Sequence, residues 1–293
     1  LPVSWHNHVS GDHYTISEAW LDRVQEVLDY AVDDDMYVIL NIHHDTDKEY
    51  CYPDKEHLEQ SLSYMTFIWE QLADRFGDYD EHVIFESINE PRLVETDHEW
   101  WLDMNAAECV EAVECINEWN QNFVDVVRKT GGNNATRYLM VPGYDASADG
   151  VLNDKFVLPT DTAENEGKIL VSVHAYIPYH FALQAATENE SIDQFNASEK
   201  TSTNDIDQMM EKLYAKYISN EIPVVIGEFG ARDKNGNLQS RVDYAAYYIA
   251  AARAYGMSCN WWDNNAFTGD GELFGLLTWR YPRIVDALMK YAE

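Results

Sequence analysis

The sequence contains few positively charged residues. It has 20 Lys and Arg against 52 Asp and Glu among its 293 residues, which gives a formal net charge of −32 at pH 7. A field of this sign repels phosphate groups and anionic lipids, so we expect neither nucleic acid nor a membrane as a partner. A neutral ligand does not feel this repulsion. The balance fits a monomeric enzyme secreted from the cell, although no basic-then-apolar signal segment opens the sequence.

Cysteine is also scarce, and long apolar runs are missing. The cysteines form no Cys-x-x-Cys pair, which disfavours both a metal site and a disulfide scaffold; they are Cys51, Cys109, Cys115 and Cys259. We expect free thiols, and the sequence also allows one disulfide bond. No apolar stretch approaches the ~18 residues that suggest a transmembrane helix.

Further absences limit the architecture. No Gly-rich phosphate loop follows an early strand, which disfavours a dinucleotide-binding sheet. There is also no internal repeat and no Pro- or Ser-rich linker. Because single α/β barrels commonly run to about 250 residues, one catalytic domain over residues 1–293 is the simplest expectation.

The sequence alternates between short apolar runs and amphipathic stretches. The runs predict strands over residues 2–5, 37–42, 83–87, 138–141, 169–173, 223–226 and 258–262. Helical spacing predicts a helix that includes Trp20 to Ala31 and further helices over 58–76, 106–129, 206–220, 241–255 and 282–291. Thr15 and Glu18 have the pattern of a capping box at the head of the first helix. Residues 143–168 show no convincing helix.

Alternating strands and helices predict an α/β protein with a parallel sheet and right-handed crossovers. The strand candidates, counted from residues 2–5 to 258–262, number one fewer than the eight of a closed barrel. We therefore expect a (β/α)8 TIM barrel whose first strand–helix unit is absent from the sequence.

Polar and aromatic residues follow successive strand candidates directly. A (β/α)8 barrel places its active site at this end of its strands. The residues are His43, His44, Asp45, Asn89, Glu90, Tyr144, His174, Tyr176, Glu228, Trp261, Trp262 and Asn264. A hydrophobic core does not explain them, so we predict a substrate site that includes His43, His44, Tyr144, Trp262 and Asn264.

Two of these residues, Glu90 and Glu228, carry carboxyl groups at the ends of apolar strands. Glycoside hydrolysis needs one carboxyl group to protonate the leaving oxygen and another to attack or to activate water. Asn89 could hold a sugar hydroxyl, Tyr176 could keep Glu228 ionised, and His174 could orient either acid. A single glutamate at a strand end is more often only solvated. Two of them in one series of strands favour catalysis.

The segment His43-His44-Asp45 has two other interpretations, as structural residues or as metal ligands. Neighbouring residues on an extended segment point to opposite sides, which disfavours one shared ion. We therefore predict neither a metal nor a cofactor.

The paired tryptophans also allow two interpretations. Trp261 and Trp262 could both be core residues, or one could form a stacking floor for a sugar ring. Trp100 and Trp101 could be packing residues or a distal sugar platform.

Several segments together resemble glycoside hydrolase family 5, over essentially the whole chain. They are Asn41-Ile42-His43-His44, Phe85-Glu86-Ser87-Ile88-Asn89-Glu90-Pro91, His174-Ala175-Tyr176, Ile226-Gly227-Glu228-Phe229-Gly230 and Trp261-Trp262-Asp263-Asn264. The Asn-Glu-Pro tripeptide alone is moderately specific, whereas all the segments in this order are highly specific.

The resemblance implies a (β/α)8 barrel and double-displacement hydrolysis with retention of configuration. By motif position, Glu90 would be the acid/base and Glu228 the nucleophile. The residues that match the family's active-site framework are Asn89, His43, His174, Tyr176 and Trp262. The family's first strand and helix, and the framework arginine that would directly precede Leu1, have no counterpart here.

Within the family, the chain looks most like the branch that cuts cellulose, mixed-linkage glucan and often xyloglucan or xylan. The expected function is therefore a retaining endo-β-1,4-glucanase acting on β-glucan polysaccharide. The alternatives are a mannanase or xylanase on the same scaffold, and a non-catalytic carbohydrate-binding protein. Binding alone does not need two glutamates, which disfavours the last.

Carboxyl chemistry of this kind needs no metal ion. We therefore expect EDTA to leave the rate of reducing-sugar release from a soluble glucan unchanged. Strong inhibition that a divalent ion reverses would instead support the metal-ligand interpretation of His43-His44-Asp45.

Overall fold

The computed structural model describes residues 1–269, 271–276 and 280–292. The chain divides into two compact units, Leu1–Ser172 (unit 1) and the part from Val173 onward (unit 2). A single catalytic domain over residues 1–293 stays a prediction. Within the described residues, no helix is both long and apolar enough to cross a membrane.

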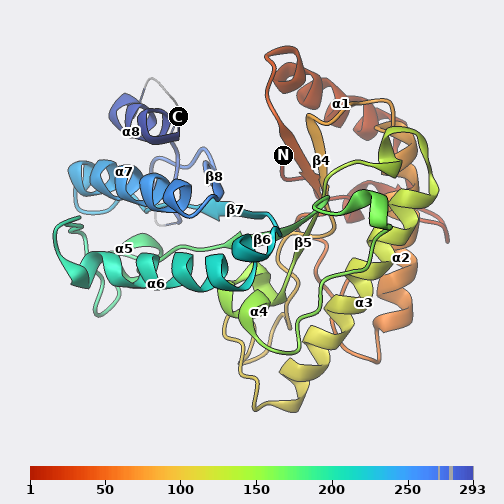
Figure 1. The fold of residues 1–293 in the computed structure, drawn as a ribbon, viewed down its shortest axis with the longest axis horizontal. Helices are drawn as coiled ribbons and strands as arrows, with labels where there is room; N and C mark the ends of the chain where they lie inside the picture. Colours follow the sequence, from red (N-terminus) through yellow and green to blue (C-terminus); the bar gives the residue numbers. More distant parts are fainter. Residues whose placement is uncertain (270, 277–279, 293) are drawn as a thin grey trace. The chain divides into compact units, whose positions relative to one another are not determined.

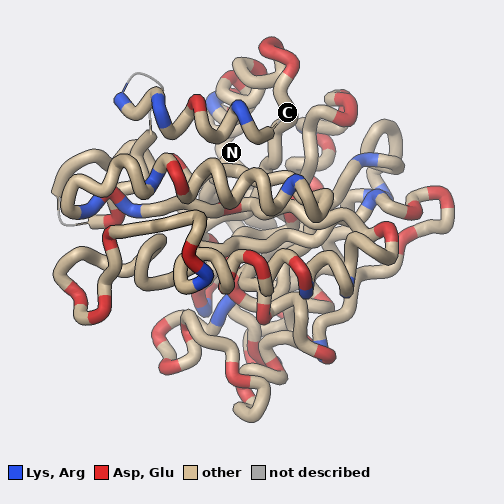
Figure 2. Tube along the Cα trace, turned by 60° about the vertical axis from the view of Figure 1, so that its left-hand side comes forward, with Lys and Arg blue, Asp and Glu red and all other residues tan. Residues whose placement is uncertain are grey.

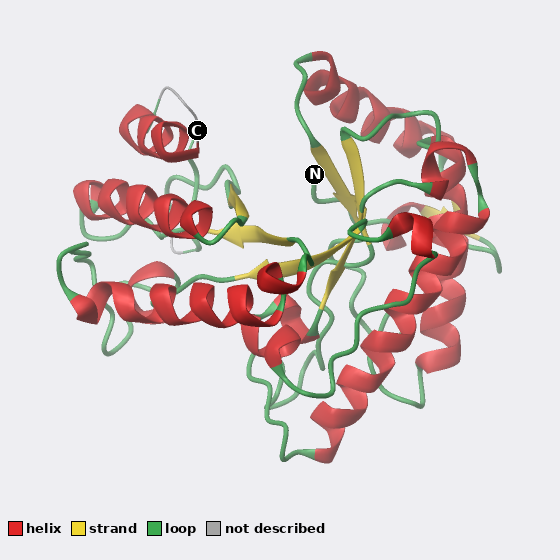
Figure 3. Cartoon of the chain, in the orientation of Figure 1, coloured by secondary structure: helices red, strands yellow, loops and turns green. Residues whose placement is uncertain are grey.

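Unit 1 is built on parallel strands. They pair in the order β3 (Val38–Asn41), β4 (Val83–Glu86), β5 (Leu139–Pro142) and the start of β6 (Ile169–His174) (Figure 3). Almost every residue of these strands is buried, which explains why the runs read as continuously apolar. A short antiparallel pair, β1 (Val9–Ser10) and β2 (Thr15–Ile16), precedes them.

Three long helices complete unit 1: α1 (Glu18–Asp33), α2 (Leu58–Arg75) and α3 (Ala107–Lys129) (Figure 1). Trp69 of α2 fixes the packing, because its ring lies 5.3 Å from that of Phe85 in β4 and 4.6 Å from that of Phe123 in α3. Its indole nitrogen donates to the Ser87 carbonyl at 2.9 Å. This buried side chain therefore aligns two helices with the end of β4, where the site begins.

Unit 2 repeats the strand–helix pattern. It contains the end of β6, β7 (Val224–Phe229) and β8 (Ser258–Trp261), with β7 and β8 parallel. The Ala175 amide donates to the Glu228 carbonyl at 2.9 Å, so the segment after β6 runs beside β7. The helices are α5 (Tyr179–Ala182), α6 (Lys200–Lys216), α7 (Leu238–Ala254) and α8 (Pro282–Ala292). Helices α7 and α8 pack together through Ala245, Leu276, Ile284 and Ala287.

Most predicted elements lie close to the observed ones, but the helix predicted over 206–220 begins at Lys200 and ends at Lys216. Two further corrections concern the N-terminus. Residues 2–5 form no strand, although the chain there runs beside β3: the Leu1 amine donates to Ile39 O at 2.7 Å and the His43 amide to Val3 O at 2.9 Å. The predicted capping box is wrong, because Thr15 belongs to β2 and the residue before α1 is Ser17, without a side-chain cap bond.

Residues 143–168, predicted without a helix, hold three short ones: η3 (Tyr144–Ala146), α4 (Ala148–Leu152) and η4 (Ala163–Asn165). Single turns are too short to show a helical period. The local signal was Ser147, whose hydroxyl accepts from the Gly150 amide at 3.0 Å. A Cβ on Gly150 would lie 2.2 Å from the Tyr144 carbonyl oxygen, so this turn requires glycine.

The acidic residues and the cysteines each have a clear distribution along the chain. Acidic residues occur in loops and helices throughout the described chain, with few basic residues among them (Figure 2). All four cysteines are free, as expected for the thiols, and Cys51, Cys109 and Cys115 are buried.

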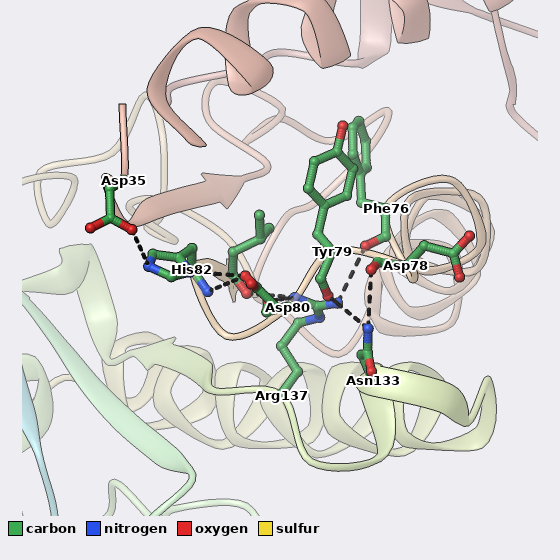
Figure 4. A network of polar contacts seen from close by, with 9 residues as sticks. Asp35, Phe76, Asp78, Tyr79, Asp80, His82, Asn133 and Arg137 are labelled. Atoms are coloured by element: carbon green, nitrogen blue, oxygen red, sulfur yellow. Dashed lines mark hydrogen bonds and ion pairs between the residues drawn. The ribbon is translucent and has the colours of Figure 1, made fainter. Parts of the chain in front are cut away.

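Arg137 holds the loop between α2 and β4 (Figure 4). It is 3% exposed. Its guanidinium donates at 2.6–3.3 Å to Asn134 Oδ1 and to the carbonyl oxygens of Phe76, Gly77, Tyr79, Asp80 and Val83. Burial lowers the pKa of Arg137 to about 10, which leaves it charged at neutral pH. Asn133 supports the same loop by donating to the carbonyls of Asp78 and Tyr79.

We predict that Arg137→Met lowers the free energy of unfolding by about 3 kcal/mol, because several buried carbonyl groups lose their donor. Urea denaturation followed by circular dichroism measures the change. Arg23→Met is the control, since Arg23 is exposed and pairs with Glu26 one turn away, and it should change stability little. Equal stability of the two variants would contradict a structural role for Arg137.

Candidate active site

Asn89 and Glu90 follow β4, where the strand ends. The Asn89 amide donates to the Ile42 carbonyl at 2.8 Å, which holds this segment beside the residues that follow β3. The Asn41 side-chain nitrogen contacts Asn89 Oδ1 at 3.4 Å. With its oxygen facing a donor, the Asn89 side chain directs its own NH2 group elsewhere, as hydrogen bonding to a sugar hydroxyl requires.

Beneath Asn89 lies a buried polar group that the sequence prediction missed. Glu86 is 3% exposed, accepts from Asn41 Nδ2 at 3.0 Å and accepts from Ser172 Oγ at 2.6 Å. These side chains come from β4, β3 and β6, so the Glu86 carboxyl group connects its own strand to the neighbouring β3 and, past β5, to β6. A signal was available: each is a polar residue inside an otherwise apolar strand.

Arg92 is a second missed residue. Its guanidinium donates to the Glu90 carbonyl at 3.0 Å and lies 3.9 Å from Glu90 Oε2. A guanidinium group therefore lies directly beside the predicted acid/base. In the sequence, only its position two residues after Glu90 indicated that Arg92 could lie near the site.

His43 and His44 follow β3. His43 is buried, with Nδ1 3.3 Å from Asn41 Nδ2, and its ring lies edge-on to His44 at 4.3 Å. Loss of hydration lowers the pKa of His44, against the opposing effect of the nearby Glu90 carboxylate. A neutral imidazole of this kind can both donate and accept hydrogen bonds.

Asp45 has a structural position. It is fully buried, and its oxygens accept from the Trp5 amide at 3.0 and 3.1 Å and from the Tyr64 hydroxyl at 2.7 Å, with His6 Nδ1 at 2.6 Å. The carboxylate therefore anchors the first residues of the chain. Its bonds are directed to these groups, so the geometry does not support the metal-ligand interpretation of His43-His44-Asp45.

Another cluster in unit 1, Asp54, Glu56 and His57, has ligand-type atoms within 4.8 Å of one another. His57 Nδ1 already lies 2.7 Å from Asp54 Oδ1, which accounts for their closeness without an ion. The sequence prediction did not single out this cluster, and it has no part in the site after β4.

In unit 2, Glu228 lies in β7 and is buried. The Tyr176 hydroxyl donates to Glu228 Oε2 at 2.6 Å, and His174 Nδ1 lies 3.7 Å from Glu228 Oε1. A short hydrogen bond from a phenol to a carboxylate stabilises the charged form and fixes its orientation. Tyr176 and His174 thus both lie beside Glu228, as the sequence interpretation expected.

The segment after β8 separates its two tryptophans. The Trp261 ring packs edge-on against Phe229 at 5.4 Å, and its Nε1 points to the Phe274 carbonyl at 3.4 Å. Trp262 donates its backbone amide to the Phe229 carbonyl at 2.8 Å and is only partly buried. Trp261 is therefore a packing residue, and Trp262 stays the candidate for the stacking floor.

Two predicted substrate-binding residues hold loops. Tyr144 is fully buried; its hydroxyl accepts from the Leu93 amide at 3.0 Å and donates to the His98 carbonyl at 2.5 Å. Asn264 donates to the Glu272 carbonyl at 2.8 Å and accepts from the Ala266 amide at 3.1 Å. Both side chains therefore hold loops through these bonds, and their contact with a sugar stays a prediction.

Residues 1–268 match the family model described as cellulase (glycosyl hydrolase family 5). The chain belongs to glycoside hydrolase family 5. It is 42% identical to endoglucanase B of Ruminococcus albus, over 100% of this chain and 68% of that protein.

Solved structures of family 5 enzymes agree. A lichenase from a Caldicellulosiruptor species has a TM-score of 0.98 at 59% identity, covering 100% of this chain and 79% of that one. A broad-specificity endoglucanase from Ruminococcus champanellensis, with bound cellotriose, has a TM-score of 0.88 at 44% identity, covering 98% and 80%. The family 5 chain is thus a glycoside hydrolase, and the (β/α)8-barrel fold class predicted from the sequence is confirmed.

We predict that Tyr176→Phe lowers kcat about 10- to 100-fold, because the Glu228 carboxylate loses a short hydrogen bond. The loss should be similar on a glucan and on an activated aryl cellobioside, since any leaving group needs the same nucleophile. Steady-state kinetics on both substrates measures this. Unchanged kcat would show that the phenol does not assist Glu228.

Proposed function

We propose that this family 5 enzyme is a retaining endo-β-1,4-glucanase in which Glu90 is the acid/base and Glu228 the nucleophile. The observation that carries the assignment is the family match over residues 1–268, which includes both glutamates in their motif positions. The hydrogen bond from Tyr176 to Glu228 supports the nucleophile role, and the position of Glu90 after β4 supports the acid/base role.

In the first step, Glu228 attacks the anomeric carbon while Glu90 gives its proton to the oxygen of the departing chain. A covalent glycosyl-enzyme forms and the sugar chain beyond the scissile bond leaves. In the second step, Glu90 takes a proton from water, and that water attacks the anomeric carbon and releases Glu228. Two inversions at one carbon give net retention.

The groups around the two glutamates suit these roles. Tyr176 stabilises the negative charge on Glu228 before attack and after release. The Asn89 amide, oriented by Asn41, can donate to a hydroxyl group next to the reacting carbon. Trp262 can support a sugar ring on its flat face, and His43 and His44 offer polar contacts to hydroxyl groups.

The proposed substrates are uncharged β-glucans: cellulose chains, mixed-linkage glucan and xyloglucan. Two of the similar proteins are named a lichenase and a broad-specificity endoglucanase, which favours a range of β-glucans over one. A polymer without charge also avoids repulsion by a protein of net charge −32. We further propose that the enzyme acts as a secreted monomer.

A substrate panel tests the assignment. We expect reducing-sugar release from hydroxyethylcellulose, mixed-linkage glucan and xyloglucan, which are all uncharged, with an early fall in viscosity because internal bonds are cut. Faster release from mannan would assign the scaffold to a mannanase, and binding without release would assign it to a carbohydrate-binding protein.

We predict that Glu228→Gln loses nearly all activity on every substrate, because no other group takes the glycosyl unit. Glu90→Gln should fail on glucans but keep more activity on 2,4-dinitrophenyl cellobioside, whose leaving group needs little protonation. Initial rates on the two substrates measure the difference. Equal losses for Glu90→Gln on both substrates would contradict its role as the acid.

A further inference from the structure

The loop that follows Glu90, residues 91–101, has no regular secondary structure but is fixed at several points. The Pro91 carbonyl accepts from the Asp145 amide at 2.7 Å. Tyr144 bonds to the loop backbone at Leu93 and His98, and the Tyr52 hydroxyl donates to the Val94 carbonyl at 3.3 Å. Such a loop presents its side chains in one arrangement, which lowers the entropy lost when a ligand binds.

Arg92 is the centre of the side-chain contacts in this loop. Besides its bond to the Glu90 carbonyl, its Nε donates to Glu99 Oε1 at 3.4 Å, and Glu99 Oε2 accepts from the Glu95 amide at 3.0 Å. The guanidinium carbon lies 4.0 Å from the centre of the Trp100 ring. One planar cation therefore contacts both Glu90 and the indole of Trp100.

The Trp100 indole is supported by a cation and is also half exposed to solvent. Arg92 covers one face, yet Trp100 remains 52% exposed. A core packing residue would not leave half its surface in water, and an unsupported surface ring would not hold one orientation. An open, pre-oriented aromatic face suits the apolar face of a glucosyl ring, whose hydroxyl groups project from its edge.

We propose that Trp100 is a stacking platform for a glucosyl unit on the leaving-group side of the scissile bond, positioned by Arg92 together with Glu90. The side follows from the chemistry of Glu90, which the proposed function supplies: the acid stands beside the departing oxygen. The contacts from Glu90 to Arg92 and from Arg92 to Trp100 connect the ring to this acid, so the side of the scissile bond that Glu90 serves is the side assigned to Trp100. Arg92 is a positioning residue, because it acts through these two side chains.

The test compares a substrate that has sugars on the leaving-group side with one that has none. Cellohexaose has such sugars, whereas β-cellobiosyl fluoride releases only fluoride. For Trp100→Ala we expect kcat/KM on cellohexaose to fall about tenfold, mainly through KM, and to stay within about twofold on the fluoride. Trp100→Phe should recover part of the loss, because a smaller ring remains.

Arg92→Met should lower kcat/KM on cellohexaose at least as much as Trp100→Ala and should also lower kcat, because the contact with Glu90 is lost. Arg92→Lys keeps the charge but not the flat guanidinium, so it should recover kcat more than KM. Tyr37→Ala is the matched control. Tyr37 is also an exposed aromatic residue, at 61%, but it lies just before β3 begins. This substitution should leave kcat/KM unchanged on both substrates.

Two outcomes overturn the platform. One is an equal loss on both substrates for Trp100→Ala, which indicates general damage to the fold. The other is an unchanged rate on cellohexaose, including the case in which Trp101→Ala causes the loss instead. Glu90→Gln assayed beside them separates the two proposals: if it spares initial fluoride release but not cellohexaose cleavage, the acid role stands whatever Trp100 does.

Discussion

The buried carboxyl group of Glu86 is the contact on which the site in unit 1 depends. A carboxyl group removed from water is tolerated only where hydrogen bonds replace its hydration. Asn41 supplies such a bond from the neighbouring strand β3 at 3.0 Å, and Ser172 supplies one from β6, the strand beyond β5, at 2.6 Å. The same Asn41 amide contacts Asn89, one residue before Glu90. The strand register and the direction of Asn89 are therefore set by one polar group, and loss of any of its members would disturb both.

Much of this architecture was readable from the sequence, and the failures have physical causes. Helices α2 and α3 were predicted to within a residue or so because they are long and strongly periodic. Residues 2–5 run beside β3 but form too few regular bonds to count as a strand, which no local pattern reveals. The single turns after β5 have no period at all, and their positions follow from a cap at Ser147 and a close approach at Gly150.

The candidate site divides in the same way. The glutamates and the Tyr176–Glu228 pair could be anticipated because their side chains serve chemistry that limits the choice of residue. Tyr144 and Asn264 were assigned to substrate for their position after strands, whereas the bonds of their polar atoms to loop backbone could not be anticipated. Loop paths are not encoded in residue spacing. Hence a polar residue after a strand can be placed near a site from sequence, whereas its hydrogen-bond partner cannot.

Two arginines of unit 1 lie at opposite ends of the strands and have different roles. Arg137 precedes β5 and is surrounded by carbonyl oxygens, so its charge is used entirely to hold the α2–β4 loop. Arg92 follows β4 and contacts carboxyl groups and an aromatic ring, with part of that ring left open to solvent. In parallel α/β barrels the end where strands begin serves stability and the end where they finish serves function. The partners of each arginine, rather than its burial, therefore indicate which of the two tasks it performs.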